Sequence, residues 1–480
     1  MLLLIVLLPL LAFAAILGGA KARQTAVIAS GANLALGLLA AFTWKTWANF
    51  WGFSVPVLST PEIHLSLGFI DGMSVVMLLL SVIVAFAALL TGHAPVGREK
   101  LYYGSSLLIA AGAIGAFVAT DLFFFYAFHE LALIPTFLMI GMLGRGERKA
   151  VAWKITIYLG FGSLVLLAGL VWLGAAVDTF DMTAMNDAAV IDPATQKSIA
   201  AFLIVGFGIL VSLFPFHSWA APAYASAPAP TAMLHAGVLK KFGLYGLLRL
   251  GVPLVPEGLS AWLVPLCVLL LGNILWVGFV TISQKRLDGM LGNSSVMHMG
   301  YIFLAIAALA AAPDHPWALP AAVLLMFAHG VSIAMLFGLA DKIERATGTL
   351  DLDELGGLAK SAPSLAFLFG LVGMASIGLP GLANFVGEVM VFISAFHPGN
   401  YNPVAGLGPV QITCILAIWG VVISAIYMLR AYRKVFQGPS GKLTEGAADL
   451  SLGDRVPAIL LSVVLIVVGL CPNLLLSLLR

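Results

Sequence analysis

The feature that most restricts the fold of this chain is a series of apolar segments, each close to the length of a membrane-spanning helix. A helix needs about 20 predominantly apolar residues to cross a bilayer. Of the 480 residues, 61% are hydrophobic and only 10% are charged, whereas about a quarter of the residues of soluble domains are charged. Suitable segments lie near residues 1–20, 24–48, 73–92, 103–120, 121–143, 150–177, 198–214, 228–252, 258–283, 290–312, 316–341, 362–397, 405–433 and 455–477.

These segments predict an all-α polytopic membrane protein with about fourteen transmembrane helices. The longest polar stretches, near 49–72, 178–197, 342–361 and 434–455, are too short for a soluble domain. We expect the opening run Met1–Leu17 to be a retained first span, because it lacks a basic start and a small-residue cleavage site. The composition excludes a water-soluble enzyme and a disordered chain, and a net charge of +2 excludes a nucleic-acid binder.

The placement of basic residues predicts the orientation in the membrane. Of the 24 Lys and Arg residues, 17 lie in odd-numbered loops, and only four lie in even-numbered loops or at the termini. Basic loops stay on the cytoplasmic side of a membrane. We therefore expect the odd-numbered loops to face the cytoplasm, or the mitochondrial matrix, and both termini to face the opposite side.

Charged residues inside the predicted spans are the main candidates for function. Each costs about 2.5–3.5 kcal/mol at the centre of a span, so such residues must face one another, water or a partner subunit. Chains of acids, lysines and histidines in spans suit proton relay, although a buried histidine can also be a packing residue and a lysine can anchor helices through an ion pair. The charged residues are Glu130, Lys154, Lys240, Lys241 and Glu388, and the histidines are His129, His217, His235, His298 and His329.

Lys240 and Lys241 are adjacent and therefore point about 100° apart on one helix. They cannot both enter the same narrow path, so we expect one of them to face a neighbouring helix or to reach toward the membrane surface.

Two of the spans contain helix-breaking sequences. Pro215 lies in the first interruption and Pro380 in the second, 165 residues later. Irregular backbone at membrane depth occurs only inside protein or beside a water cavity, and paired interruptions favour an inverted-repeat transporter; the alternative is two ordinary proline kinks. Within a single membrane domain, 1–480, we predict inverted five-helix repeats at 103–252 and 258–433, with flanking helices in 1–92 and 455–477.

No motif in the chain predicts a cofactor or a metal site. The three cysteines, Cys267, Cys414 and Cys471, lie singly in apolar stretches, and phosphate-binding or zinc-protease motifs do not occur. Paired histidines are able to ligate haem, but nothing in their spacing favours it. We therefore expect a gradient or a partner subunit to supply the energy for any transport.

Seven motifs together resemble the antiporter-like membrane chains of respiratory complex I, the proton-pumping NADH:quinone oxidoreductase. The resemblance is to subunit M, called chain 4 in mitochondria, and Glu388 favours M because several relatives carry lysine there. The motifs are FHELALIP with Glu130, AWKITIY with Lys154, FPFHSW with His217, AGVLKKFGLYGLLR with Lys240 and Lys241, NSSVMHMGY with His298, FAHG with His329, and GLPGLANFVGE with Glu388.

The resemblance implies proton translocation within a bacterial plasma membrane or its mitochondrial equivalent. NADH oxidation and quinone reduction would take place in other subunits, and antiporter-like subunits would adjoin this chain on both sides. In that scheme Glu130 biases the protonation of lysine, and Lys241 is the central carrier. His298 and His329 then extend the relay, and Glu388 passes the proton toward the exit.

Three alternatives to this role remain open. The chain resembles subunits of multisubunit sodium/proton antiporters and of membrane-bound hydrogenases in most of the same motifs. It also departs from the family at Leu210, where the seventh helix usually bears the lysine that pairs with the glutamate at position 130. Either Lys240, His129 or Lys154 replaces that partner, or the chain has lost its own proton path and is mainly structural.

Overall fold

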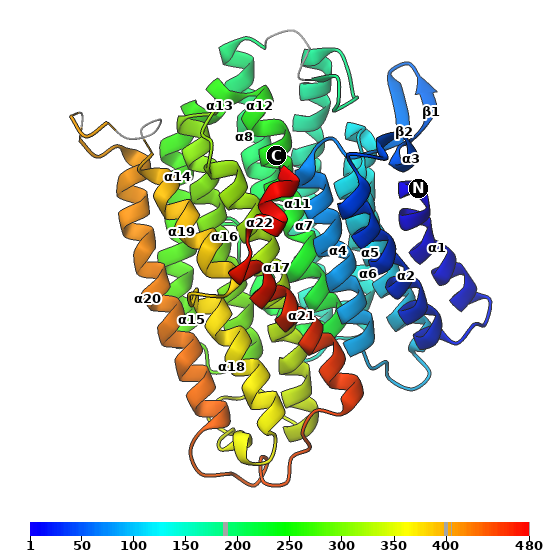
Figure 1. The fold of residues 1–480 in the computed structure, drawn as a ribbon, viewed down its shortest axis with the longest axis vertical. Helices are drawn as coiled ribbons and strands as arrows, with labels where there is room; N and C mark the ends of the chain where they lie inside the picture. The colour runs from blue at the N-terminus through cyan, green and yellow to red at the C-terminus, as the bar shows by residue number, and fades with distance from the viewer. Residues whose placement is uncertain (186–190, 398–401, 405, 480) are drawn as a thin grey trace.

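The structure is a computed structural model that describes residues 1–185, 191–397, 402–404 and 406–479. It is a bundle of long helices that run roughly along one direction, with α1 and α20 at opposite edges (Figure 1). The first half contains α1 (Leu2–Leu17), α2 (Ala22–Thr43), α3 (Ala48–Trp51), β1 (Phe53–Ser59), β2 (Glu62–Leu67), α4 (Gly72–Thr91), α5 (Glu99–Val118), α6 (Leu122–Leu143), α7 (Arg148–Val177), α8 (Pro193–Val211) and α9 (Ala220–Ser226).

The predicted span 228–252 is a helical run that contains the π-helical segments η2 and η3, and the predicted span 258–283 contains the π-helical segment η4. These spans comprise α10 (Ala229–Leu234), η2 (His235–Leu239), α11 (Lys241–Gly246), η3 (Leu247–Gly251), α12 (Val252–Leu254), α13 (Pro256–Ala261), α14 (Leu263–Leu271), η4 (Gly272–Val277) and α15 (Gly278–Ser283). The remainder comprises α16 (Leu287–Ala311), α17 (Ala318–Thr347), η5 (Leu358–Lys360), α18 (Pro363–Ile377), α19 (Ala383–Ala395), α20 (Pro409–Phe436), α21 (Leu452–Leu470), α22 (Asn473–Leu476) and η6 (Ser477–Leu479).

The predicted helical membrane architecture is confirmed. Within the described ranges, 11 helices are long and apolar enough to cross a membrane. Together with α1, the run α10–α12 and the pair α18/α19, they give the predicted number of about fourteen spans. The chain is an integral multi-pass membrane protein. Arg480 and part of the predicted loop 178–197 lie outside the described residues.

Burial separates central helices from peripheral ones. The 18-residue apolar stretch of α17 is entirely buried, and that of α16 is 94% buried. The corresponding stretches of α2 and α21 are only 33% and 39% buried. A helix that is apolar and buried all round belongs in the interior of a bundle. α16 and α17 therefore form the centre of the second half, and the candidate histidines His298 and His329 lie on them.

The predicted loop 49–72 contains the one departure from an all-α fold among the described residues. β1 and β2 pair antiparallel, from Phe53 with Leu67 to Ser59 with Glu62. The hairpin projects at one end of the bundle, beside α3 (Figure 1). Alternation of apolar and polar residues in EIHLSL is typical of a half-buried strand, but the length of the stretch alone had indicated a loop.

Both predicted helix breaks are present. α8 ends at Val211, and Ser212 adopts a left-handed conformation with φ 68°. Asn273 pairs with two backbone groups that the break leaves without a helical partner. Its Oδ1 accepts from Phe214 N at 2.7 Å, and its Nδ2 donates to Ser212 O at 3.1 Å. α18 ends before Gly378 at φ 83°. Ser212 and Leu213 are buried at the first break, whereas Leu379 and Pro380 at the second break are exposed on the surface of this chain. The equivalence of 103–252 and 258–433 as inverted repeats stays a prediction.

Candidate functional site

Lys241 and His329 meet at the centre of the bundle. Lys241 lies on α11 and is fully buried, and His329 on α17 is 3% exposed. Nζ of Lys241 donates to Ala236 O at 2.7 Å and lies 2.9 Å from Nδ1 of His329. An ammonium group has donors only, so a neutral imidazole accepts from it, and a neutral amine can accept in return. The contact is therefore suited to passing a proton in either direction.

His298 lies next to His329 and joins it to the second helix break. The two ring centroids are 5.6 Å apart. Nδ1 of His298 lies 2.8 Å from Ser294 O, and its Nε2 lies 3.0 Å from Ser376 O in the last turn of α18. Both neighbours are carbonyl acceptors, so only the doubly protonated imidazolium donates to both. A neutral His298 ring therefore donates to only one of these two carbonyls at a time.

Glu388 is buried on α19 beside the same break. Glu388 is 4% exposed. Its carboxylate lies so close to Gly378 that a Cβ at that glycine would collide with it. None of the ion pairs among the described residues includes Glu388. The role of Glu388 in passing the proton toward the exit stays a prediction.

Lys240 points away from the Lys241–His329 contact. Its Nζ lies 3.4 Å from Ser295 Oγ and 5.4 Å from the centroid of the Tyr224 ring. Tyr224 also approaches His235, whose Nδ1 lies 3.4 Å from the tyrosine hydroxyl. The two adjacent lysines thus face different neighbours, as the helical geometry predicts.

Glu130 lies near the outer surface of the bundle, between α6 and α7. Its side chain is 34% exposed, and it lines a groove of about 290 Å³. Oε1 of Glu130 accepts from Ser163 Oγ at 2.5 Å and lies 3.4 Å from Nδ1 of His129. Of the three replacements considered for the lysine missing at Leu210, only His129 contacts Glu130 in the described part of the chain.

His129 connects Glu130 to the helix of the central lysines. Its ring stacks on Phe242, with centroids 4.1 Å apart, and Phe242 follows Lys241 in sequence. Lys154, by contrast, lies in none of the ion pairs of the described residues. The predicted site therefore divides into a central Lys241–His329–His298 cluster and a peripheral Glu130–His129–Ser163 cluster.

His217 lies apart from both clusters. Its ring stacks on Phe214 with centroids 5.4 Å apart, and its buried Nδ1 has no partner in the described residues. It lines a cavity of about 330 Å³ together with Gln284 and Asn293. His217 therefore faces a cavity at the first helix break instead of the central lysine.

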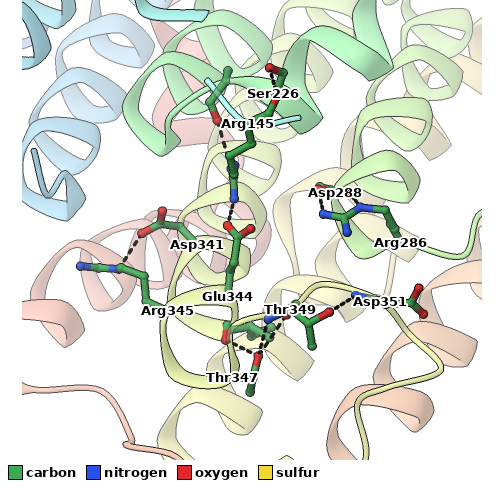
Figure 2. Close-up of polar contacts among 12 residues, drawn as sticks. Arg145, Ser226, Arg286, Asp288, Asp341, Glu344, Arg345, Thr347, Thr349 and Asp351 are labelled. Carbon is green, nitrogen blue, oxygen red and sulfur yellow. Dashed lines mark hydrogen bonds and ion pairs between the residues drawn. The ribbon is translucent and has the colours of Figure 1, made fainter. Parts of the chain in front are cut away.

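An ion-pair network holds the end of α17, as Figure 2 shows. Arg145, between α6 and α7, pairs with Glu344 of α17 and donates to Ala227 O at 3.0 Å. Arg345 pairs with Asp341 on the same helix at 3.1 Å. The Arg145–Glu344 pair thus joins the first half of the chain to α17, the helix that also carries His329.

The sequence interpretation missed several neutral polar residues and one ion pair. Arg249 lies in η3 and makes two hydrogen bonds to Asp71, at 2.7 and 2.6 Å. Asp71 also caps α4 by accepting from Met73 N at 2.8 Å. The position of Asp71 directly before an apolar run is typical of an N-cap and was the available signal.

In the described parts of the chain, no group of three or more His, Cys, Asp or Glu residues is arranged to hold a metal ion. Cys267, Cys414 and Cys471 are free thiols.

Comparison with known proteins identifies the family. The family described as "NADH:quinone oxidoreductase/Mrp antiporter, TM" matches residues 119–429. NAD(P)H-quinone oxidoreductase chain 4 1 of Synechococcus sp. (strain JA-3-3Ab) is 33% identical over 98% of this chain and 89% of its own length. The chain 4 1 of Picosynechococcus sp. (strain ATCC 27264 / PCC 7002 / PR-6) is 34% identical over 85% of this chain and 76% of its own length.

Solved structures show the same fold. A chain of respiratory complex I from Thermus thermophilus with bound NADH has a TM-score of 0.88 and 28% identity, over 100% of this chain and 98% of that one. A chain of the Mrp complex from Dietzia sp. DQ12-45-1b has a TM-score of 0.82 at 22% identity, over 99% of this chain and 95% of that one. The chain belongs to the NADH:quinone oxidoreductase/Mrp antiporter family of membrane chains.

Proposed function

We propose that the chain is subunit M (chain 4) of a proton-pumping NADH:quinone oxidoreductase. It translocates protons, while NADH oxidation and quinone reduction take place in other subunits, and other membrane subunits of the complex adjoin it. The resemblance to chain 4 along almost the whole chain supports this assignment. The observation that carries it is the contact between Lys241 and His329, 2.9 Å apart and buried at the bundle centre.

The central cluster supplies the steps of the transfer. Lys241 gives a proton to Nδ1 of His329, which leaves a neutral amine and an imidazolium. The ring of His298, 5.6 Å away between centroids, then accepts the proton, with its two carbonyl neighbours stabilising the charged form. Glu388 takes up the proton beyond the second helix break and becomes a neutral carboxyl group.

The peripheral cluster sets the timing of that transfer. A negative Glu130 attracts a positive charge on His129, whose ring stacks on Phe242 beside Lys241. Charge on His129 disfavours a second positive charge nearby and therefore pushes the proton of Lys241 toward His329. In this chain His129 thus takes the place of the lysine that Leu210 replaces.

The test is Lys241→Ala in the assembled complex, reconstituted into vesicles. We expect proton pumping per electron to fall strongly, together with turnover, because the central carrier is lost. Unchanged pumping and turnover in a fully assembled complex would overturn the proposal. Sodium-dependent proton flux without NADH would instead indicate a sodium/proton antiporter, and tolerance of every buried-charge substitution would indicate a structural subunit.

We further propose that the chain lies in the bacterial plasma membrane with both termini on the non-cytoplasmic side. The excess of Lys and Arg in odd-numbered loops supports this orientation. Single cysteines placed near Lys21 and near Lys45, in a variant without the native cysteines, test it. The Lys45 site should react with a membrane-impermeant thiol reagent from outside the cell, and the Lys21 site should react only in inverted vesicles; the reverse pattern would overturn the orientation.

A further inference from the structure

His217 and Lys154 are two predicted site residues that neither cluster of the proposed relay uses. His217 lines the cavity of about 330 Å³ at the first helix break, and its buried Nδ1 has no partner among the described residues. Lys154 on α7 and the buried Lys240 both lie close enough to His217 to interact with it electrostatically. A ring nitrogen of histidine can donate a hydrogen bond, and buried polar groups are normally paired. An unpaired imidazole nitrogen between two lysines therefore points to a ligand that accepts hydrogen bonds and is negatively charged.

The cavity at the first helix break combines polar and apolar walls. Its polar side chains are His217, Ser218, Gln284 and Asn293, and the other lining residues are Ala221, Pro222, Ala225 and Gly289. None of the described residues that line it is acidic. Pro222 and Gln284 are exposed, so the cavity opens at the surface of this chain. These walls suit an amphiphile with an anionic group.

Basic residues without an ion-pair partner surround the mouth of the cavity. Gln284 is followed by Lys285, and its carbonyl accepts a hydrogen bond from Arg430. Nε of Arg430 is a second buried nitrogen that has no partner among the described residues. Lys154, Lys285 and Arg430 belong to none of the ion pairs in the described part of the chain.

The acidic residues of the same region are already neutralised. Asp288, next to the lining residue Gly289, pairs with Arg286 at 2.8 Å. Asp353, which interacts electrostatically with Lys285 and Arg430, pairs with Lys434. The charge left over around the cavity is therefore positive, and a positive cleft attracts anions.

The lengths of the helices place the cavity near the lipid headgroups. α7 has 30 residues and is therefore about 45 Å long, whereas the hydrocarbon layer of a bilayer is about 30 Å thick. Lys154 is the seventh residue of α7 and Asn293 is the seventh residue of α16. Both residues thus lie about 9 Å from helix starts that follow basic, odd-numbered loops. A lysine at that depth extends its ammonium group into the headgroup layer.

We propose that this cavity binds the phosphate group of an anionic phospholipid from the leaflet that contacts the odd-numbered loops. His217, Lys154 and the amide of Asn293 donate to the phosphate oxygens. The acyl chains lie on the outer face of α7, where Trp153 and Ile157 are 60% and 65% exposed. Basic pockets between membrane helices on the cytoplasmic side bind anionic headgroups in this way. The apolar walls and the adjoining apolar helix face favour a lipid over free phosphate.

A phosphatidylglycerol with a photoreactive headgroup tests the site without any variant. The assembled complex is reconstituted into phosphatidylcholine vesicles that contain this probe, and the labelled peptides are identified by mass spectrometry. We expect labelling within residues 217–225 and 284–293, with competition by unlabelled phosphatidylglycerol. Equal competition by added phosphatidylcholine, or no labelling of either peptide, would overturn the proposal. Competition by inorganic phosphate would also overturn it, because the cavity would then bind free phosphate and not a lipid.

Variants test the residues that hold the phosphate. Lys154→Met removes the charge at similar length and should lower the labelling about tenfold, the loss expected for one hydrogen bond to a charged group. His217→Phe keeps the stacking on Phe214 but removes the ring nitrogens, and it should also lower the labelling. The matched control is Lys149→Met, an exposed lysine of the same helix that lies about 140° around it from Lys154. Labelling of both variants at the level of this control would overturn the proposal, and the readout does not depend on proton pumping.

Discussion

Nζ of Lys241 lies 2.9 Å from Nδ1 of His329, and this contact joins residues 88 positions apart in the chain. One proton shared between an amine and an imidazole can rest on either group, and a nearby charge decides which. The neighbouring Lys240 takes no part, because it faces Ser295 and Tyr224. The relay therefore uses Lys241 and not the adjacent Lys240.

His329→Leu should therefore disable the transfer as effectively as loss of the lysine. The substitution removes the only side chain that is hydrogen-bonded to Nζ of Lys241 among the described residues. A positioned proton acceptor contributes about 10²–10⁴-fold to rate, so we expect pumping to fall by at least about tenfold. Proton uptake by vesicles that contain the assembled complex measures the change. Pumping at the normal rate would show that Lys241 has another acceptor.

Lys240→Met should have a much smaller effect than Lys241→Met. The first variant removes a buried ammonium that is not in contact with the histidine pair, and methionine fills the same space without a charge to desolvate. We expect proton pumping to change by less than about twofold, against at least about tenfold for Lys241→Met. Equal losses for the two variants, in complexes with equal assembly, would contradict the separation of the two side chains.

Glu130→Gln should lower the number of protons pumped per electron. The amide preserves the shape and can still accept from Ser163 Oγ, now 2.5 Å from Oε1, but it no longer attracts a positive charge to His129. Glu147→Gln, a change of the same chemistry in the nearby loop, is the matched control. An unchanged ratio would indicate that the chain has lost its own proton path with the substitution at Leu210 and serves as a structural link.

The sequence predicted the features that are determined by the bilayer itself. The cost of polar groups in hydrocarbon predicted the spans and the burial of Lys241 and Glu388, and the prolines predicted the two interruptions at Pro215 and Pro380. Those constraints act on each segment separately, so they can be evaluated without knowing which helices are neighbours.

Contacts between helices could not be predicted in the same way. His129 precedes Glu130 on α6. Whether Lys154 of α7 also reaches Glu130 depends on how α6 and α7 rotate against each other. Neutral residues such as Tyr301 and Asn384 carry no charge penalty, so nothing in the hydropathy marks them. Only the structure reveals that they are buried and that, among the described residues, the hydroxyl of Tyr301 and Oδ1 of Asn384 have no hydrogen-bond partner.

Arg145→Ala should loosen the junction between the two halves of the chain (Figure 2). Arg145 pairs with Glu344, and its guanidinium also donates to Ala227 O at 3.0 Å. Because both side chains of the pair are partly exposed, we expect a loss of only about 1–2 kcal/mol, measured as a lower melting temperature of the purified complex. Lys434→Ala, which breaks a more exposed ion pair with Asp353, should leave the melting temperature nearly unchanged. An equal drop for both variants would contradict the prediction.

The start of α17 should loosen in acid because of His315. Nδ1 of His315 accepts from the backbone N–H groups of Trp317 and Ala318, at 3.1 Å each, and Nε2 donates to Ser394 O at 2.8 Å. An imidazolium has no acceptor, so protonation breaks the cap. Burial lowers the pKa of His315 below its usual 6.5, and the adjacent ring of His397, 4.5 Å away between centroids, lowers it further.

Because the folded-state pKa is lowered, the stability contributed by this cap is complete above pH 6.5 and is lost as the pH falls through the lower, folded-state value. Hydrogen exchange at the amides of Trp317 and Ala318 measures it, and exchange corrected for intrinsic rate should accelerate on acidification. His315→Asn keeps an oxygen that can accept from the helix N-terminus but cannot titrate. Its corrected exchange should be independent of pH in this range, and a pH dependence equal to that of the unmodified chain would show that another group loosens the helix.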